Sequence, residues 1–208
     1  AYCREMTDVV LGSAITEIPQ YAFAGCISLK NINLGGITTV GDNAFIEDAA
    51  LTTVDLSKAE TIGEYAFYGC INLGESNVYA SIEDMKDGKD PLKGDVIIGE
   101  GVQSIGARAF HSCNRIAEIT IPNSVATIGG GAFSGCTGLT SITIPDSVTG
   151  IGYSAFYGCT SLSDQTGIKN WDVEGASLRE MFYGCTNLTT VDFCGYVFKS
   201  VNCSFKAF

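Results

Sequence analysis

The stretch Ile119-Thr120-Ile121-Pro122-Asn123-Ser124-Val125-Ala126-Thr127-Ile128-Gly129 recurs one period later as Ile142-Thr143-Ile144-Pro145-Asp146-Ser147-Val148-Thr149-Gly150-Ile151-Gly152. The two copies begin 23 residues apart and keep their apolar residues at the same places. Internal repeats of roughly 20 to 50 residues are the sequence signature of stacked, repetitive folds. This pair of stretches therefore predicts a chain built from repeated coils.

An Ala-Phe pair recurs outward from these copies in both directions. It occurs at Ala22-Phe23, Ala44-Phe45, Ala66-Phe67, Ala109-Phe110, Ala132-Phe133, Ala155-Phe156 and Ala207-Phe208, and Met181-Phe182 replaces it once. The steps between successive phenylalanines are 22, 22, 43, 23, 23, 26 and 26 residues. Such regular spacing predicts that these rings are buried and stack from coil to coil.

Each position of the repeat has a physical interpretation. Ile142-Thr143-Ile144 alternates apolar and polar residues, which is typical of a short strand with one buried face. Pro145 cannot donate a hydrogen bond to a sheet and should end that strand. Val148 and Ile151 form a second apolar patch after a turn, and Gly152 is expected to permit a bend. The Ala-Phe pair then begins a short helical or irregular segment.

Stacked coils are expected to bury one another's apolar edges, because a single unit of this length cannot enclose a core. The strands should lie side by side in one parallel sheet. We expect them near Val9–Leu11, Ile32–Leu34, Val54–Leu56, Ser76–Val78, Val96–Ile98, Ile119–Ile121, Ile142–Ile144 and Val191–Phe193, with a further strand in Ile168–Val173.

The unit resembles the BspA-like (treponemal-type) leucine-rich repeat, L-x-x-L-x-L-P-x-x-L-x-x-I-G-x-x-A-F-x-x-C-x-x, over nearly the whole chain. After residue 163 the period changes from about 23 to 26, and residues 181–188 resemble the M-F-x-x-C-x-x-L repeats of bacterial surface lipoproteins. The resemblance implies one domain over 1–208, an α/β-type leucine-rich-repeat solenoid. It would be a right-handed coil with a parallel β-sheet on the concave face and short helical or irregular segments on the convex face.

Composition excludes several classes of function. The formal charge of −11 provides no attraction for nucleic acid or anionic lipid. No apolar run approaches the roughly 18 residues that a membrane span requires, and no leader is visible at the start of the chain. We therefore expect no nucleic-acid partner and no membrane insertion.

The repeat is broken at residues 79–94, where a charged segment is expected to replace the convex half of one coil. This segment is either a projecting ligand-binding loop or a tolerated insertion on a solvated edge. Its candidate binding residues are Tyr79, Glu83, Asp84, Asp87, Lys89 and Asp90. The three aspartates do not match the calcium-binding EF-hand loop, which needs a central glycine and a closing glutamate.

The outward face of the predicted sheet is a second candidate surface. Its proposed ligand-binding residues are Asn31, Asn33, Asp55, Glu118, Thr120, Thr143 and Asp192. The face lacks the aromatic and arginine side chains that dominate protein-binding hot spots, so a plain solvated face is the alternative. Tyr68, Tyr157 and Tyr183 directly follow a phenylalanine, and we expect them to cover the joints between coils.

Six of the nine cysteines follow the phenylalanine anchors at the same offset, which predicts buried, reduced thiols: Cys26, Cys70, Cys113, Cys136, Cys159 and Cys185. Cys194 and Cys203 could form a disulfide. A catalytic pair of His111 with Cys113 is disfavoured, because a reactive thiolate needs an accessible setting. Gly129-Gly130-Gly131 lacks the spacing of a phosphate-binding loop. We expect no zinc site and no cofactor.

The resemblance implies an extracellular or cell-surface protein without catalytic activity, a binding or adhesion module for extracellular protein or glycan partners. A monomer is favoured. Two alternatives remain: a passive spacer that displays another domain, and an enzyme with its site in the 79–94 segment. That segment is the sole feature supporting an enzyme.

Overall fold

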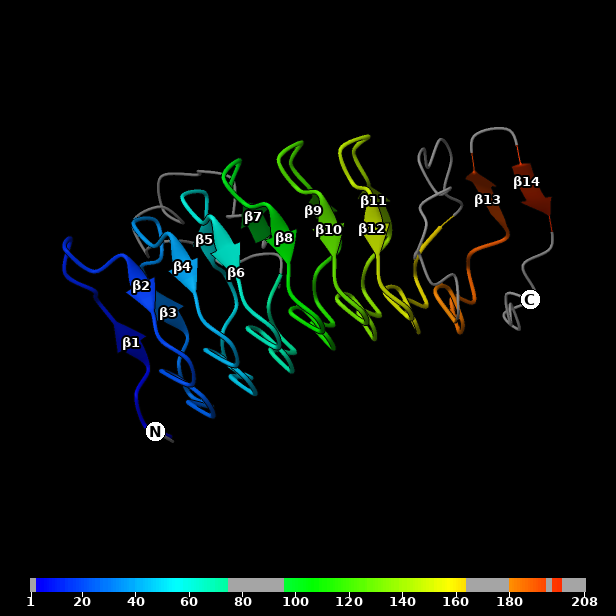
Figure 1. Cartoon of the computed structure of the whole chain (residues 1–208). Helices are drawn as coiled ribbons and strands as arrows, with labels where there is room; N and C mark the ends of the chain where they lie inside the picture. The colour runs from blue at the N-terminus through cyan, green and yellow to red at the C-terminus, as the bar shows by residue number, and fades with distance from the viewer. Residues whose placement is uncertain (1–2, 75–95, 164–179, 194–195, 200–208) are drawn as a thin grey trace, which may run out of the picture.

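The computed structural model describes residues 3–74, 96–163, 180–193 and 196–199. The chain winds into coils that lie beside one another in sequence order (Figure 1). One phenylalanine from each coil joins a single column of near-parallel rings, with neighbouring centroids 5.2 to 5.8 Å apart. The column contains Phe23, Phe45, Phe67, Phe110, Phe133, Phe156 and Phe182. The predicted stack is therefore confirmed for these seven rings.

The first sheet is parallel and occupies the positions that the sequence indicates. It consists of β5 (Asp55–Leu56), β7 (Val96–Ile98), β9 (Glu118–Thr120) and β11 (Ser141–Thr143), hydrogen-bonded in that order. Before it, β1 (Asp8–Val9) pairs in parallel with β3 (Asn31–Ile32). Ile119 and Ile142 are partners in the ladder and are both buried. The predicted alternation of buried and exposed residues is thus confirmed along β9 and β11.

A second parallel sheet, not predicted from the sequence, runs along another side of the coils. Its strands are β2 (Glu17–Ile18), β4 (Thr39–Val40), β6 (Thr61–Ile62), β8 (Ser104–Ile105), β10 (Thr127–Ile128) and β12 (Gly150–Ile151). The register aligns one buried aliphatic residue from each coil. Strands of two residues carry no alternating pattern, so sequence periodicity could not reveal them.

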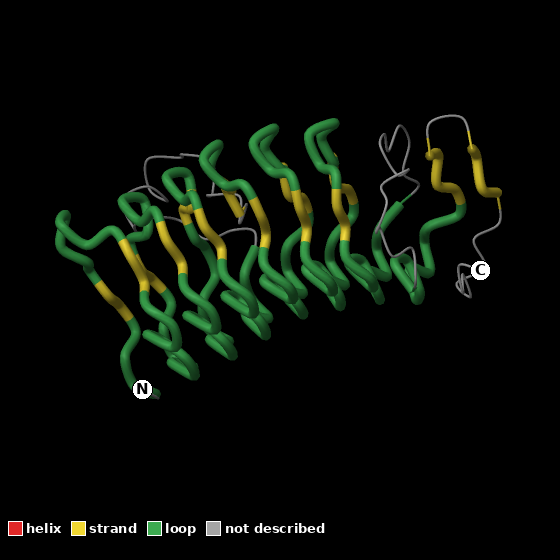
Figure 2. The backbone as a smooth tube through the Cα atoms, in the orientation of Figure 1, coloured by secondary structure: helices red, strands yellow, loops and turns green. Residues whose placement is uncertain are grey.

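The Ala-Phe segments are turns, and the described residues contain no helix (Figure 2). Their amide groups bond to the adjacent coil: Phe67 N donates to the carbonyl of Ala109 and Gly69 N to that of His111. Two residues in each turn adopt positive φ, for example Ser154 at 54° and Gly158 at 69°. Left-handed residues at this spacing interrupt any α-helix. The side of the coils that carries these turns is therefore irregular, which is one of the two forms expected from the sequence, and the helical form is not observed in the described residues.

The coils on either side of residues 75–95 stack directly on each other. Phe67 lies 5.4 Å from Phe110, and Leu56 in β5 pairs with Ile98 in β7. No further coil lies between them, so the expectation that the 79–94 segment replaces the convex half of such a coil is wrong; the segment itself lies outside the described residues. The predicted strand Ser76–Val78 lies outside the described residues, and β5 and β7 are direct neighbours in the sheet.

The last strands differ from the expected parallel arrangement. β13 (Thr190–Phe193) pairs antiparallel with β14 (Tyr196–Lys199), so the strand predicted at Val191–Phe193 exists but belongs to a separate two-stranded sheet. The predicted strand within Ile168–Val173 lies outside the described residues. Phe182 nevertheless stacks on Phe156 at 5.5 Å, so the coil with the longer period keeps the same anchor.

Gly152 is required for a different reason from the expected bend. Its φ is not positive, whereas a Cβ built on it would lie 2.3 Å from the backbone nitrogen of Gly130 in the preceding coil. Gly106 shows the same relationship, with a Cβ 2.5 Å from the carbonyl carbon of Gly63. The glycine that follows β4, β6, β8, β10 and β12 therefore allows the backbones of neighbouring coils to approach closely, whereas Pro19 follows β2.

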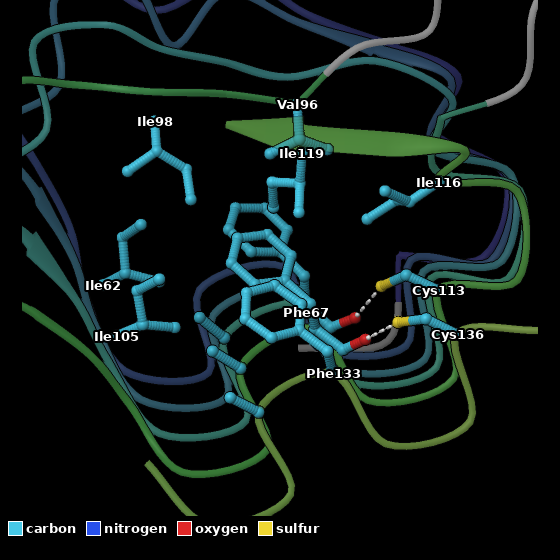
Figure 3. Packing of buried hydrophobic residues seen from close by; sticks show 14 of the residues in the cluster. Ile62, Phe67, Val96, Ile98, Ile105, Cys113, Ile116, Ile119, Phe133 and Cys136 are labelled. Carbon is cyan, nitrogen blue, oxygen red and sulfur yellow. Dashed lines mark hydrogen bonds between the residues drawn. The ribbon is translucent and has the colours of Figure 1, made fainter. Parts of the chain in front are cut away.

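The six repeat cysteines are buried thiols, as predicted. From Cys70 onward, each donates to the carbonyl of the phenylalanine in the preceding coil. Two such bonds are drawn in Figure 3, from Cys113 to Phe67 at 3.2 Å and from Cys136 to Phe110 at 3.0 Å. Burial raises the pKa of Cys136 to about 12, so this thiol stays protonated at neutral pH.

Candidate binding site on the turns

The turn of each coil presents two rows of side chains along the solenoid. We call the residue two places before the phenylalanine the −2 row and the residue directly after it the +1 row. The −2 row comprises Tyr21, Asn43, Tyr65, Arg108, Gly131, Ser154 and Glu180, and the +1 row comprises Ala24, Ile46, Tyr68, His111, Ser134, Tyr157 and Tyr183. Both rows lie on adjoining, hydrogen-bonded turns, so residues of successive coils are neighbours in space.

The −2 row keeps side chains where the backbone favours glycine. Every member has a φ between 52° and 64°, yet only Gly131 is a glycine. Arg108 at 52° and Ser154 at 54° flank it. A left-handed conformation is unfavourable by roughly 1–2 kcal/mol for an L-residue. Because this conformation recurs in every described coil, it belongs to the turn of the repeat.

The +1 row forms two aromatic stacks with a gap between them. His111 lies 4.6 Å from Tyr68, and Tyr157 lies 5.2 Å from Tyr183, each distance joining ring centroids. Between the two stacks the row holds Ser134, a buried side chain without a ring. The sequence-based expectation that these tyrosines cover coil joints is consistent with the stacking, but it does not account for the gap.

The coil of Ser134 also has no side chain in the −2 row, and the two omissions together leave a slot on the turns. Gly131 has no side chain, and the ring of Tyr153 leans over Gly130, where an added Cβ would meet its Cε1 at 3.0 Å. The slot has a volume of about 580 Å³. The described residues that line it are Arg108, His111, Gly131, Ser134, Tyr153, Ser154, Tyr157 and Glu180.

One wall of the slot is held in place by polar and aromatic contacts. The Arg108 guanidinium lies 5.6 Å from the centre of the Tyr65 ring, and its Nη1 donates to the Tyr65 hydroxyl at 2.8 Å. Burial, followed by the positive charge of Arg108, lowers the pKa of His111. His111 is therefore neutral at pH 7, and Arg108 and Glu180 are the formal charges among the described lining residues.

The sheet-face residues predicted as a binding surface are exposed but partly occupied by local bonds. Exposed members of that prediction are Asn31, Asn33, Asp55, Glu118, Thr120 and Thr143. The amide of Asn33 bonds both backbone groups of Leu11 in the preceding coil, and Asn31 donates to Asp8 at 2.7 Å. Asn31 and Asn33 thus fasten one coil to another. The side chain of Asp192 lies outside the described set.

The other predicted binding region cannot be placed. Tyr79, Glu83, Asp84, Asp87, Lys89 and Asp90 lie outside the described residues, as do the aspartates considered for calcium. Across the described ranges, no group of three His, Cys, Asp or Glu side chains could hold a metal ion. Nor does the described part of the chain form a helix long and apolar enough to cross a membrane.

The geometry gives Cys113 no role as a nucleophile. Its side chain is fully buried, its thiol donates to Phe67, and burial raises its pKa well above the usual value. His111 Nδ1 instead lies 2.8 Å from the hydroxyl of its neighbour Ser112. The slot was missed from the sequence because its signal is an absence: Gly131 has no side chain in the −2 row, and Ser134 has no ring in the +1 row.

The comparisons with known proteins agree with this architecture. The family described as "BspA type Leucine rich repeat region" matches residues 1–89 and 93–207 in six copies. A comparison with curated proteins gave no match.

Among solved structures, a leucine-rich repeat protein from T. pallidum is similar with a TM-score of 0.66 and 26% identity, covering 87% of this chain and 77% of that one. A leucine-rich repeat protein from Bacteroides ovatus is similar with a TM-score of 0.47 and 26% identity, covering 92% of this chain and 56% of that one. A leucine-rich cell surface protein from Faecalibacterium prausnitzii is similar with a TM-score of 0.46 and 25% identity, covering 93% of this chain and 61% of that one. The chain thus spans less than two thirds of the latter two.

Proposed function

This chain belongs to the family of BspA-type leucine-rich repeats, and on that premise we propose that it is a non-catalytic binding module of the cell surface or of a secreted protein. Its partners are extracellular proteins or glycans. The proposal rests on one observation above all, the slot between the two aromatic stacks of the turns. Solenoids use the long surfaces of their coils for binding.

The slot has the features of a binding site rather than of a packing defect. Its walls present aromatic faces and polar groups that converge on one volume of about 580 Å³, within the size range of small-molecule sites. Arg108, Ser154 and Glu180 remain at strained backbone positions around it, where glycine would relieve the strain. The same backbone conformation recurs in the coils away from the slot, so what distinguishes these three residues is their position around it.

Two further surfaces belong to the proposal as secondary contacts. The exposed polar residues of the first sheet, such as Glu118 and Thr120, offer hydrogen-bonding groups to a large partner. The 79–94 segment, whose candidate residues are Tyr79 and five charged side chains, is the other secondary contact. The slot ranks first because its aromatic and charged side chains line one volume.

A binding array with the intact chain tests the proposal. Extracellular matrix proteins and glycans are immobilised, and retention of the wild type is compared with that of Ser134→Tyr. This variant places in the gap a ring that Tyr157 and Tyr183 already carry at the same repeat position. Retention that the substitution abolishes supports binding at the slot. Retention lost only when residues 79–94 are deleted would assign binding to that segment and contradict the proposed site.

The alternative of a passive spacer makes a different prediction. The first-sheet face of small polar residues, and the fastening of coils by Asn31 and Asn33, would suit a purely structural array. A spacer retains no matrix protein or glycan in the array, either as wild type or as Ser134→Tyr. Such a result would overturn the proposal of a binding module.

A further inference from the structure

We infer that the slot binds a single sugar ring of a neutral glycan, sandwiched between the ring faces of His111 and Tyr157 above Ser134. This inference rests on the proposed function and specifies the ligand of the same site. Three observations carry it: the spacing of the gap, the polar character of the lining, and the charge of the molecule.

The gap has the thickness of one ring in a continuing stack. The coil of Ser134 lies between those of His111 and Tyr157, and the core rings beneath are spaced 5.6 Å from Phe110 to Phe133 and 5.8 Å from Phe133 to Phe156. A flat ligand in the gap would therefore lie one coil step from each aromatic face. The stacked pairs on either side have comparable spacings of 4.6 and 5.2 Å.

The lining suits a ring that is apolar on its faces and polar around its edge. Aromatic faces carry partial negative charge and attract the weakly positive C–H groups on a sugar ring's faces. Arg108, Ser154 and Glu180 stand around the slot with donors and acceptors for the hydroxyls on the sugar's edge. A pyranose has both features, because its C–H groups lie on its faces and its hydroxyls lie at its edge.

Other flat ligands match the lining less well. A partner's phenyl ring would stack on the same two faces, but it carries no hydroxyl groups for Arg108, Ser154 and Glu180 to bind. A nucleotide would bring its phosphates towards a protein of formal charge −11, which repels them. A neutral sugar meets neither obstacle.

Saturation-transfer NMR with the intact chain provides the test. The probes are the methyl pyranosides of glucose, galactose, mannose and N-acetylglucosamine, each at millimolar concentration. We expect saturation of the ring protons of at least one sugar, strongest at the C–H groups that face His111 and Tyr157. L-Tyrosine amide serves as the competing aromatic probe. If it binds while no sugar does, the site is a pocket for protein side chains and the glycan inference is overturned.

Two pairs of variants locate the binding. Ser134→Tyr should remove the signal, whereas Ile46→Tyr, at the same repeat position outside the slot, should retain it. Tyr157→Ala should weaken binding by about fivefold or more, as expected from the loss of one aromatic face, whereas Tyr183→Ala should have less effect. Tyr157 and Tyr183 are each 39% exposed, so they are matched in accessibility, and thermal unfolding of all four variants controls for misfolding.

The outcomes separate this inference from the broader proposal. Sugar binding that survives Ser134→Tyr in a folded protein overturns the placement of the ring. The absence of any sugar signal overturns the glycan inference, yet array binding that Ser134→Tyr still abolishes would leave the proposed binding module intact.

Discussion

The thiol of Cys113 donates a hydrogen bond to the carbonyl oxygen of Phe67, 3.2 Å away in the preceding coil. The same carbonyl accepts the backbone N–H of Cys70 within its own coil. Each of these buried cysteines thus links the turn of one coil to that of the coil before it. The repeated cysteine is therefore both an apolar filler and a hydrogen-bond donor.

Replacement of Cys113 by alanine should lower the free energy of unfolding by about 1–2 kcal/mol. The substitution removes one buried bond and leaves a small cavity beside Phe110. Urea denaturation measures the effect, with Cys3→Ala as a control because Cys3 is exposed. Equal stabilities of the two variants would refute a structural role for the thiol bond.

The buried thiols should resist alkylation in the folded protein. Burial raises the pKa of Cys136 to about 12 and that of Cys113 well above its usual value. Treatment with iodoacetamide at pH 8, followed by peptide mass spectrometry, should label the exposed Cys3 and spare Cys113 and Cys136. Rapid labelling of Cys136 without denaturant would contradict its place in the core.

Asp48 should make the protein less stable as the pH rises from about 4 to about 7. It occupies the cysteine position of its coil, fully buried, and its Oδ1 accepts from Cys26 N at 2.6 Å while Oδ2 has no partner within the described chain. Burial raises its pKa to about 7. Between about pH 4 and pH 7 the folded state keeps the Asp48 proton, whereas the unfolded state has lost it. The free energy of unfolding therefore falls as the pH rises through this range.

Replacement of Asp48 by cysteine should restore the repeat and remove most of that decline. At pH 8 the gain is expected to be about 2–4 kcal/mol, the free-energy equivalent of the shift. Chemical denaturation at several pH values measures it, and Glu47→Gln, an exposed neighbour, is the control. An unchanged pH profile in Asp48→Cys would show that another group titrates.

Three glycine-to-alanine substitutions should destabilise the fold to different extents, in an order set by the local geometry. Gly36→Ala should be nearly neutral because no atom lies within 4 Å of the added Cβ. Gly158→Ala, at φ 69°, should lose roughly 1 kcal/mol through backbone strain alone. Gly106→Ala should be the most harmful because its Cβ would meet Gly63 at 2.5 Å. Thermal unfolding gives the order, and a mild effect at Gly106 would contradict the close stacking of coils.

The sequence was sufficient to predict the elements that have a repeating apolar signal. Ile119 and Ile142 alternate with polar residues, and Phe110 and Phe133 recur at a fixed spacing, so the first sheet and the ring column followed directly. The second sheet did not, because a strand such as Thr127–Ile128 is too short to alternate and is stabilised by its neighbours in other coils.

The candidate site was harder to predict for a related reason. Sequence reasoning looks for residues that are present, and it selected the polar sheet face and the 79–94 segment. The slot is defined by the absence of a side chain at Gly131 and of a ring at Ser134, and it becomes visible only when His111 and Tyr157 are placed on either side. The sequence shows the regular spacing of the aromatic residues in the +1 row. That the missing ring at Ser134 leaves room for a ligand follows only from the distance between stacked rings in the structure.

The most direct test is a crystal structure of the chain with the methyl pyranoside that gives the strongest NMR signal. We predict electron density for one sugar ring above Ser134, with its two faces towards His111 and Tyr157 and its hydroxyls within hydrogen-bond distance of Arg108 or Glu180. Density for the sugar on the first sheet or elsewhere on the molecule, with the slot empty, would contradict the account.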